Sequence, residues 1–273
     1  MRIEKSLNAF EFRKKSSLGF MGLYLSLKNE LNAYKKYKSM IISQLMDPIL
    51  NFLFIGVALS YNIGYFSYNG NYINYGDYVM MGIIGMLIMS KLYQIIYRAT
   101  VHKRYGLMAL KFQNGIKPYV YIIGMSLYQT FVLILQGLVM YIFALFFGNN
   151  INFFNFLISL IAASVFFWFW SSIGVFLTIF FKDYTKRDMV VNVLLTPLSF
   201  AAPIFFVLEN SPPVIRAVAS INPLTYQVVS VRSIAFGEPN SLFIGISTFI
   251  TILSIVLVSI LLSKAKLTFV ERS

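Results

Sequence analysis

Residues 153–181 read FFNFLISLIAASVFFWFWSSIGVFLTIFF and contain no Asp, Glu, Lys or Arg. A helix of about 20 apolar residues crosses the roughly 30 Å hydrocarbon core of a bilayer. The run therefore predicts a transmembrane helix. Its length exceeds the minimum, so we expect the helix to tilt or to protrude from the membrane.

Five further apolar runs accompany this one, and the whole composition agrees with them. The chain has 273 residues, of which 58% are hydrophobic and 12% charged, with a mean hydropathy of +0.71. Soluble domains carry about 25% charged residues. We therefore expect an all-α integral membrane protein with six transmembrane helices, at about residues 40–59, 78–97, 118–147, 153–181, 189–208 and 242–262.

The basic residues fall almost entirely on one side of this arrangement. Of 23 Lys and Arg residues, only Arg216 and Arg232 lie in the connections that follow odd-numbered spans. The others precede span one, follow spans two and four, follow span six, or, as Lys91, lie near the end of span two. Basic connections remain in the cytoplasm. This predicts a multi-pass protein of the plasma membrane with both termini cytoplasmic, whose net charge of +13 faces anionic lipid and not nucleic acid.

Residues 1–38 are expected to form a cytoplasmic segment that is retained, because it lacks the apolar core of a cleavable signal. Within it, apolar residues recur at helical spacing opposite a polar face, which predicts an amphipathic helix in the membrane interface. The alternative is a helix packed on another subunit. The apolar face comprises Phe20, Tyr24, Leu27, Leu31 and Tyr34, the polar face Lys28, Glu30, Asn32 and Lys35, and Lys35, Lys36 and Lys38 would meet anionic lipid.

Residues 39–273 would form the transmembrane domain, in which residues 209–238 differ from the other outer connections. Residues 209–213 break the helix, and Asn222-Pro223 supplies an N-cap and a first-turn proline between two apolar pieces, 214–220 and 224–236. Each piece is too short to cross a bilayer. We expect short re-entrant helices in the outer leaflet; the alternative, a seventh span, would place the basic C-terminus outside.

Motifs for chemistry are missing from the chain. It has no cysteine and one histidine, which disfavours a metal site. It has no Gly-Lys pair and therefore no Walker A loop, and neither His-Glu-x-x-His nor Gly-x-Ser-x-Gly occurs. We expect no catalytic residue, no metal site and no bound cofactor in this chain. The cores of spans three to six are free of charges, which disfavours ion coupling.

Three polar residues near the spans have structural interpretations. The long stem of Lys91 would let its ammonium snorkel to the cytoplasmic interface, the alternative being a substrate contact. Asp47, beside Pro48, would cap the start of span one. His102 would be a solvated residue of a cytoplasmic connection.

Taken together, several stretches resemble the membrane subunit of ABC-2 type exporters, over about residues 18–265. In that family a separate ATPase drives transport through a short coupling helix between spans two and three, and two permease subunits work with two ATPases. The resemblance lies in 44–50 (QLMDPIL), 78–86 (YVMMGIIGM), 104–110 (RYGLMAL) with 116–118 (IKP) and Gly124, 196–198 (TPL) through 203–205 (PIF), 221–226 (INPLTY) and 231–232 (VR).

The resemblance implies a coupling helix at about 102–112, which contacts the ATPase through Arg104, Tyr105, Gly106, Leu107 and Leu110. ATP and Mg²⁺ would be bound by two copies of that partner, and a second permease subunit, identical or homologous, would complete a dimer. Where family members often have an acidic residue, this chain has His102, Lys103 and Arg104, so a salt bridge from that position is not expected. The alternative is a basic loop kept inside by its charge alone.

The resemblance also implies a substrate path, and the uncharged spans suit amphipathic, lipid-like or drug-like cargo. The alternative role of each polar residue on the path is a hydrogen bond between helices. Glycan exporters resemble one another in a tryptophan-bearing segment near span one, whereas Trp168 and Trp170 lie in span four, so polysaccharide or lipid-linked glycan is the second choice. A membrane assembly factor or a lipid-modifying enzyme is the alternative from another class. The path residues would be Asn51, Ser90, Gln94, Asn192, Thr196 and Ser199.

Overall fold

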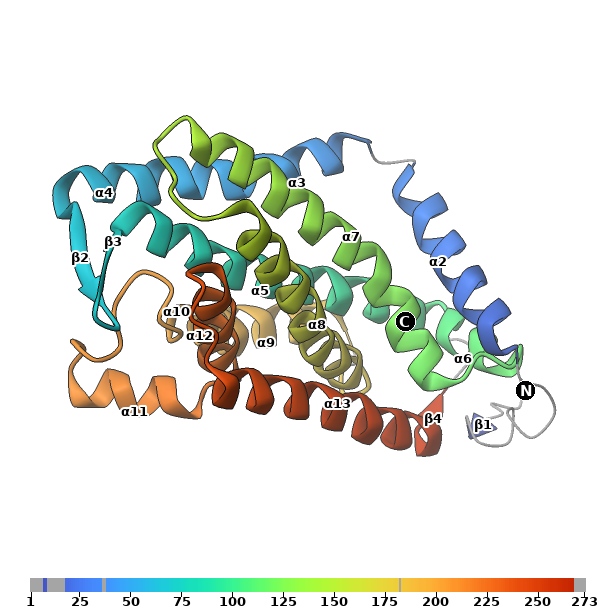
Figure 1. Ribbon diagram of the computed structural model, residues 1–273. Helices are drawn as coiled ribbons and strands as arrows, with labels where there is room; N and C mark the ends of the chain where they lie inside the picture. The colour runs from blue at the N-terminus through green and yellow to red at the C-terminus, as the bar shows by residue number, and fades with distance from the viewer. Residues whose placement is uncertain (1–6, 9–17, 36–37, 182, 268–273) are drawn as a thin grey trace.

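The computed structural model describes residues 7–8, 18–35, 38–181 and 183–267, and it is mostly helical (Figure 1). Within these residues, five helices are long and apolar enough to cross a membrane. The first is the run Ser43–Ile63, built from α3 (Lys38–Asn51), the π-helical η1 (Phe52–Val57) and α4 (Ala58–Ile63). The others are α5 (Tyr75–Arg104), α7 (Pro118–Leu145), α8 (Phe153–Thr178) and α13 (Ser241–Lys264). The prediction of a multi-pass helical membrane protein is confirmed in this form.

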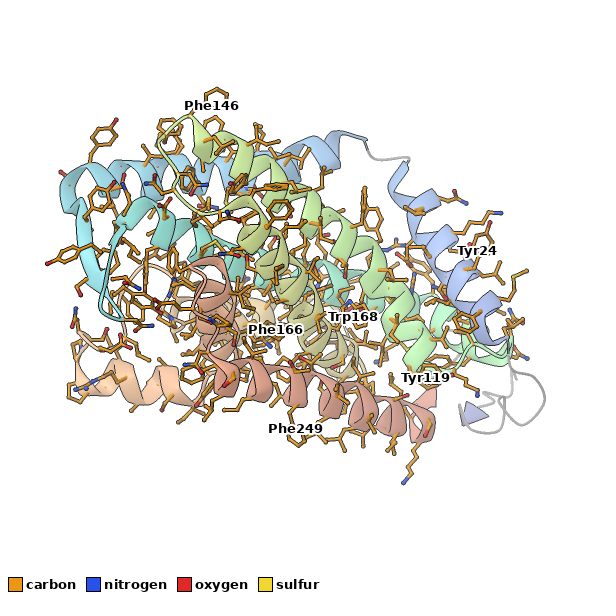
Figure 2. The ribbon with its side chains drawn as sticks, in the orientation of Figure 1. Tyr24, Tyr119, Phe146, Phe166, Trp168 and Phe249 are labelled. Atoms are coloured by element: carbon orange, nitrogen blue, oxygen red, sulfur yellow. The ribbon has the colours of Figure 1, made fainter. Side chains whose placement is uncertain are left out.

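Helix α5 is the centre of the bundle. It packs against α8, α7, η1 and α12 (Pro223–Ala235), and its side chains from Tyr78 to Met89 are almost all buried. The outer faces of α8 and α13 instead expose large apolar side chains such as Ile158 and Leu257. Phe249 of α13 is a further example, and Figure 2 shows it pointing away from the bundle. A helix that is apolar on all sides is typical of a membrane span. These exposed faces are therefore the surface that meets acyl chains.

The predicted fifth span is helical only in its first part. Helices α9 (Tyr184–Val190), η2 (Val191–Leu195) and α10 (Thr196–Phe200) follow one another, but the helix ends at Phe200 and residues 201–207 are irregular. The prediction of one continuous helix over 189–208 is thus wrong, and a sixth span stays a prediction. A proline at 203 contributes to the break, because it lacks an N–H and restricts the residue before it.

Side chains from neighbouring helices donate hydrogen bonds to the backbone carbonyls of this irregular segment. The hydroxyl of Tyr75 donates to the carbonyl of Phe205 at 2.7 Å, and that of Tyr78 donates to the carbonyl of Phe206 at 2.8 Å. The guanidinium of Arg232 donates to the carbonyl of Pro203 at 3.0 Å. Irregular backbone at membrane depth is tolerated only where protein or water supplies such partners.

The irregular segment passes so close to α5 that the facing residue of α5 must be a glycine. A Cβ built on Gly82 of α5 would lie 2.3 Å from the carbonyl oxygen of Ile204. Because backbone cannot yield like the tip of a side chain, we expect Gly82→Ala to lower the free energy of unfolding by about 1–3 kcal/mol. Thermal unfolding of the purified chain in detergent measures this change.

Gly245→Ala in α13 is the matched control, since its Cβ would meet nothing within 4 Å. Helix propensity favours alanine there by up to about 1 kcal/mol. Equal melting temperatures for the two variants would contradict the close approach of α5 to Ile204.

The connections contain more structure than the sequence predicted. Strands β2 (Tyr65–Tyr68) and β3 (Asn71–Asn74) form a hairpin where only a polar loop was expected. Its turn is Asn69-Gly70, both with positive φ, a typical two-residue hairpin signal. Strands β1 (Leu7–Asn8) and β4 (Lys266–Leu267) pair in antiparallel fashion, so these two segments, far apart in sequence, lie side by side.

The two short helices predicted within 209–238 are present as α11 (Pro213–Ile221) and α12. The side chain of Asn222 accepts the N–H of Leu224 at 3.0 Å, which is the predicted N-cap. Their placement in the outer leaflet stays a prediction.

Helix α2 (Gly19–Lys35) packs against α7, but not through the apolar face that the sequence predicted. The predicted apolar side chains Phe20 and Tyr24 are exposed, as an interfacial helix requires. The opposite face, however, is buried through Gly22, Ser26 and Glu30. Small residues at every fourth position let two helices approach closely. The side chains of Tyr34, Lys35, Lys36 and Lys38 lie outside the described residues.

Candidate functional site

A short helix, α6 (Leu107–Gln113), follows α5 at the end of the bundle nearest α2 (Figure 1). Gly106 adopts φ of 71°, which most other residues avoid, and this turn separates α6 from α5. Residues 102–104, which were predicted to belong to the coupling helix, instead complete the last turn of α5. The short helix within the predicted coupling segment therefore begins at Leu107.

One face of α6 is anchored and the other is open. Met108 and Phe112 are buried, whereas Leu107 and Leu110 are 39% and 46% exposed. Tyr105 in the preceding turn is also exposed. Neighbouring exposed apolar side chains on a protein surface indicate an interaction site. Of the predicted coupling residues, the structure thus brings Tyr105, Leu107 and Leu110 to one surface.

Two basic side chains at the junction of α5 and α6 contact the connection between α8 and α9. The ammonium of Lys103 donates to the carbonyls of Ile179 and Phe181 at 3.0 and 2.7 Å, beyond the end of α8. The guanidinium of Arg104 lies 4.5 Å from the ring centre of Tyr184, the first residue of α9. These contacts hold the last turn of α5, just before α6, against the segment after α8 and against α9.

A buried ionic cluster joins α2 to this junction. The Glu30 carboxylate is 3.0 Å from Arg98 Nη2, 3.6 Å from His102 Nε2 and 3.7 Å from Lys111 Nζ, and Glu30 is only 2% exposed. The predictions of a solvated polar face at Glu30 and of a solvated His102 are therefore wrong. His102 Nδ1 also lies 3.0 Å from the hydroxyl of Tyr121.

An acidic residue does lie beside this basic segment: Glu30 of α2 is 3.6 Å from His102, and it also pairs with Arg98, 68 residues away in sequence. Burial is the main cause that lowers the pKa of Lys111; Glu30 opposes this change, and the nearby Arg98 lowers the pKa further. The only sequence signal for the cluster was the Gly22-Ser26-Glu30 spacing, which marks a packed helix face.

Lys91 lies inside the bundle and does not snorkel. Its side chain is fully buried, and its Nζ has no hydrogen-bond partner among the described residues. Asp47 of α3 acts on it electrostatically. Asp47 itself is within α3, nine residues after Lys38, so the prediction that it caps the start of span one is also wrong.

Four of the six predicted path residues line one cavity within the bundle. This cavity of about 250 Å³ lies between α3, α5 and α10 and is lined by Asn51, Ser90, Thr196 and Ser199, together with Asp47 and apolar side chains. Thr196 and Ser199 donate to carbonyls of their own helical run, at Val191 and Thr196. Among the residues that the structure describes, the bonds of these two hydroxyls are local and not the interhelical hydrogen bonds of their alternative role.

The remaining two path residues lie elsewhere. Gln94 lines a second cavity, of about 290 Å³, beside Tyr97, Arg187 and Asp188. Asn192 is exposed on η2. The two cavities share Tyr93, so they are neighbours along α5.

Apolar spanning helices, a polar-lined cavity between them and an anchored helix with an exposed apolar face are features that a membrane permease requires. A family model, ABC-2 type transporter, matches residues 21–236 of the chain. The chain therefore belongs to the ABC-2 type transporter family and is a permease subunit that works with an ABC ATPase. A comparison with curated proteins gives no match to this chain.

Proposed function

We propose that this permease exports an amphipathic, lipid-like or drug-like molecule from the cytoplasm by alternating access, driven by a separate ATPase. The cavity between α3, α5 and α10 carries this proposal, because four polar residues and Asp47 converge there with apolar side chains. A site for a small amphiphile has this composition. A polysaccharide, which offers many hydroxyls, would require many more hydrogen-bonding groups.

The exposed face of α6 is the proposed contact with the ATPase. Leu107 and Leu110 would enter an apolar groove of that partner, as helices commonly do at protein interfaces. ATP and Mg²⁺ would be held entirely by the partner, in two copies. The cationic termini and connections support a cytoplasmic position for this end of the bundle in the plasma membrane.

A second permease subunit, identical or homologous, is proposed to cover η2 and α10. Val193, Leu194 and Phe200 on these elements are strongly exposed, and Phe200 also lines the cavity. A second copy would close the cavity from this side and place the path between two permeases.

Transport in proteoliposomes tests the proposal. The full chain would be coexpressed with an ATPase encoded beside it, purified and reconstituted with rhodamine 6G or a fluorescent phospholipid. We expect copurification of the two chains and accumulation of a probe that requires ATP and Mg²⁺. A stable chain that never copurifies with an ATPase would favour an assembly factor or a lipid-modifying enzyme.

Obstruction of the cavity should block transport. Ser90 lines it from α5, so Ser90→Trp would fill much of the 250 Å³. We expect ATP-driven transport to fall about tenfold or more while the ATPase stays bound, because the bulky ring removes the space in which cargo binds. Initial transport rates in proteoliposomes measure this change.

Ser263→Trp near the end of α13 introduces the same side chain outside the cavity and is the matched control. Wild-type rates in Ser90→Trp would contradict the assignment of the path to this cavity.

A further inference from the structure

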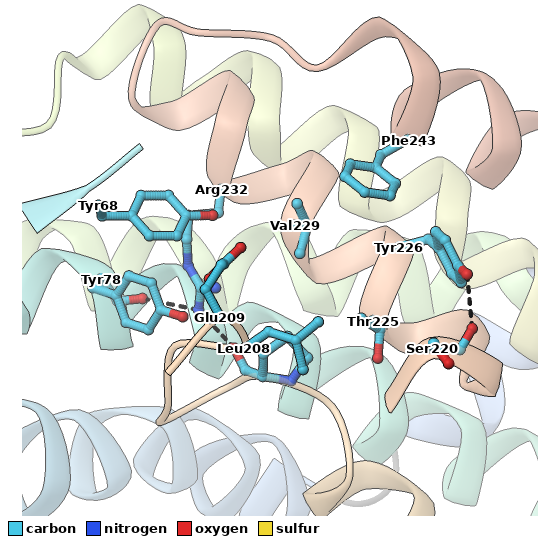
Figure 3. Close-up of a pocket in the computed structure, with 11 residues that line it drawn as sticks. Tyr68, Tyr78, Leu208, Glu209, Ser220, Thr225, Tyr226, Val229, Arg232 and Phe243 are labelled. Carbon is cyan, nitrogen blue, oxygen red and sulfur yellow. Dashed lines mark hydrogen bonds between the residues drawn. The ribbon is translucent and has the colours of Figure 1, made fainter. Parts of the chain in front are cut away.

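A third cavity lies at the opposite end of the bundle from α6. It measures about 180 Å³ and lies between β2, α5, α12, α13 and the segment after α10 (Figure 3). Most of its lining is apolar or aromatic, and it shares no residue with the path cavity between α3, α5 and α10. It is therefore a separate site.

Arg232 of α12 lines this cavity with its hydrogen-bonding capacity partly unused. Its side chain is fully buried, and its guanidinium lies 3.5 Å from the ring centre of Tyr78. One nitrogen, Nη2, donates to backbone carbonyls, including that of Pro203, whereas Nε and Nη1 have no hydrogen-bond partner among the described residues. Leaving buried charged donors unsatisfied is costly, so an acceptor at this place would stabilise the site.

Thr225 adds a second unused group. Thr225 lines the same cavity, and its buried hydroxyl has no hydrogen-bond partner among the described residues. Hydroxyl and guanidinium donors together suit a phosphate or carboxylate oxygen.

A carboxylate lies at the same cavity without neutralising Arg232. Glu209 lines it, is exposed, and acts electrostatically on the Tyr78 hydroxyl beside the guanidinium. Figure 3 shows Glu209 and Arg232 at the end of the cavity that holds Tyr68 and Tyr78. No ion pair joins the two among the described residues. The cavity thus presents one cationic and one anionic group separately.

The other end of the cavity is aromatic. Tyr226 and Phe243 lie there with ring centres 5.5 Å apart. The Tyr226 hydroxyl donates a hydrogen bond to the carbonyl of Ser220 at 2.7 Å. This wall suits the apolar part of an amphiphile.

We propose that this cavity binds the headgroup of a zwitterionic phospholipid. Arg232 and Thr225 would hold the phosphate, Glu209 would hold the ammonium, and the glycerol and first methylenes would pack on Tyr226 and Phe243. An ion carrying only one charge would leave either Arg232 or Glu209 without a partner. Binding at this site does not depend on the proposed transport activity.

Lipid retention by the full chain tests the proposal. The detergent-purified protein would be incubated separately with phosphatidylethanolamine, phosphatidylglycerol and diacylglycerol, and adducts counted by native mass spectrometry. We expect about fivefold more phosphatidylethanolamine than phosphatidylglycerol, because only the former has an ammonium for Glu209, and least diacylglycerol. Soluble glycerophosphoethanolamine is added as a competitor to distinguish a bilayer lipid, which it would not displace, from a free headgroup ester.

Glu209→Gln separates binding from folding, since Glu209 is exposed. It should abolish the preference for phosphatidylethanolamine over phosphatidylglycerol, and Thr225→Val should weaken both. Glu238→Gln, an exposed carboxylate outside the cavity that accepts a hydrogen bond from Asn71, should change neither. Equal retention of all three lipids by the wild type would overturn the proposal. An unchanged preference in Glu209→Gln would also overturn it, because Glu209 would then not bind the ammonium of the lipid.

Discussion

Replacing Glu30 with glutamine is expected to lower the free energy of unfolding by about 3–5 kcal/mol, because the loss of one partner leaves buried charges uncompensated. The carboxylate is nearly inaccessible and faces Arg98, His102 and Lys111. Glutamine retains the shape and some hydrogen bonds but offers no negative charge. The change therefore isolates the electrostatic part of the cluster, and thermal unfolding of the purified chain in detergent measures it.

Helix α2 should detach before the spanning helices unfold. It contacts α7 through Gly22, Ser26 and Leu27, and Glu30 ties it to α5 and α6, while Phe20 and Tyr24 face away from the bundle. In Glu30→Gln we therefore expect protease cleavage between α2 and α3 at temperatures at which the wild type resists.

Asp188→Asn is the matched control for Glu30→Gln. The Asp188 carboxylate forms an ion pair with Arg187 at 2.7 Å, but its side chain is 55% exposed. Exposed pairs contribute at most about 1 kcal/mol. If both variants melted at the same temperature, the buried cluster would not be what holds α2 in place.

Replacing both Leu107 and Leu110 with aspartate is expected to abolish ATP-driven transport while the chain still inserts and folds. Both side chains are exposed on α6, so the substitutions leave the buried contacts of Met108 and Phe112 unchanged. At an apolar interface with the ATPase, however, two carboxylates would be buried without partners. Such a burial costs several kcal/mol, which corresponds to a loss of binding of about a hundredfold or more.

The measurements for this double variant are copurification with the ATPase and transport in proteoliposomes. Gln113→Asp with Asn114→Asp introduces the same two charges at exposed positions at the end of α6 and is the control for charge alone. We expect the control to retain most of its transport. Unchanged transport in the leucine variant would contradict the assignment of α6 as the contact with the ATPase.

The path residues show where local sequence patterns succeed and fail. Asn51, Ser90, Thr196 and Ser199 reach one cavity because the helices that carry them run side by side. Asn192 does not, since η2 turns its side chain outward and the helix ends a few residues later at Phe200. Helical periodicity reports the face of a residue only where the helix is regular, and a π-helical stretch shifts that face.

The sequence by itself determined the membrane class, the five long apolar helices, the short helices α11 and α12 and the glycine turn before α6. These features depend on composition, on spacing along one segment and on local backbone preferences, all of which a chain carries wherever its other parts lie. Only the tertiary structure decided that Glu30 meets Arg98 and His102, that Lys91 is enclosed, and that Arg232 lines a cavity with Glu209. The physical reason is that a charge is stabilised or penalised by whatever lies within a few ångströms of it, and those neighbours come from distant segments of the chain.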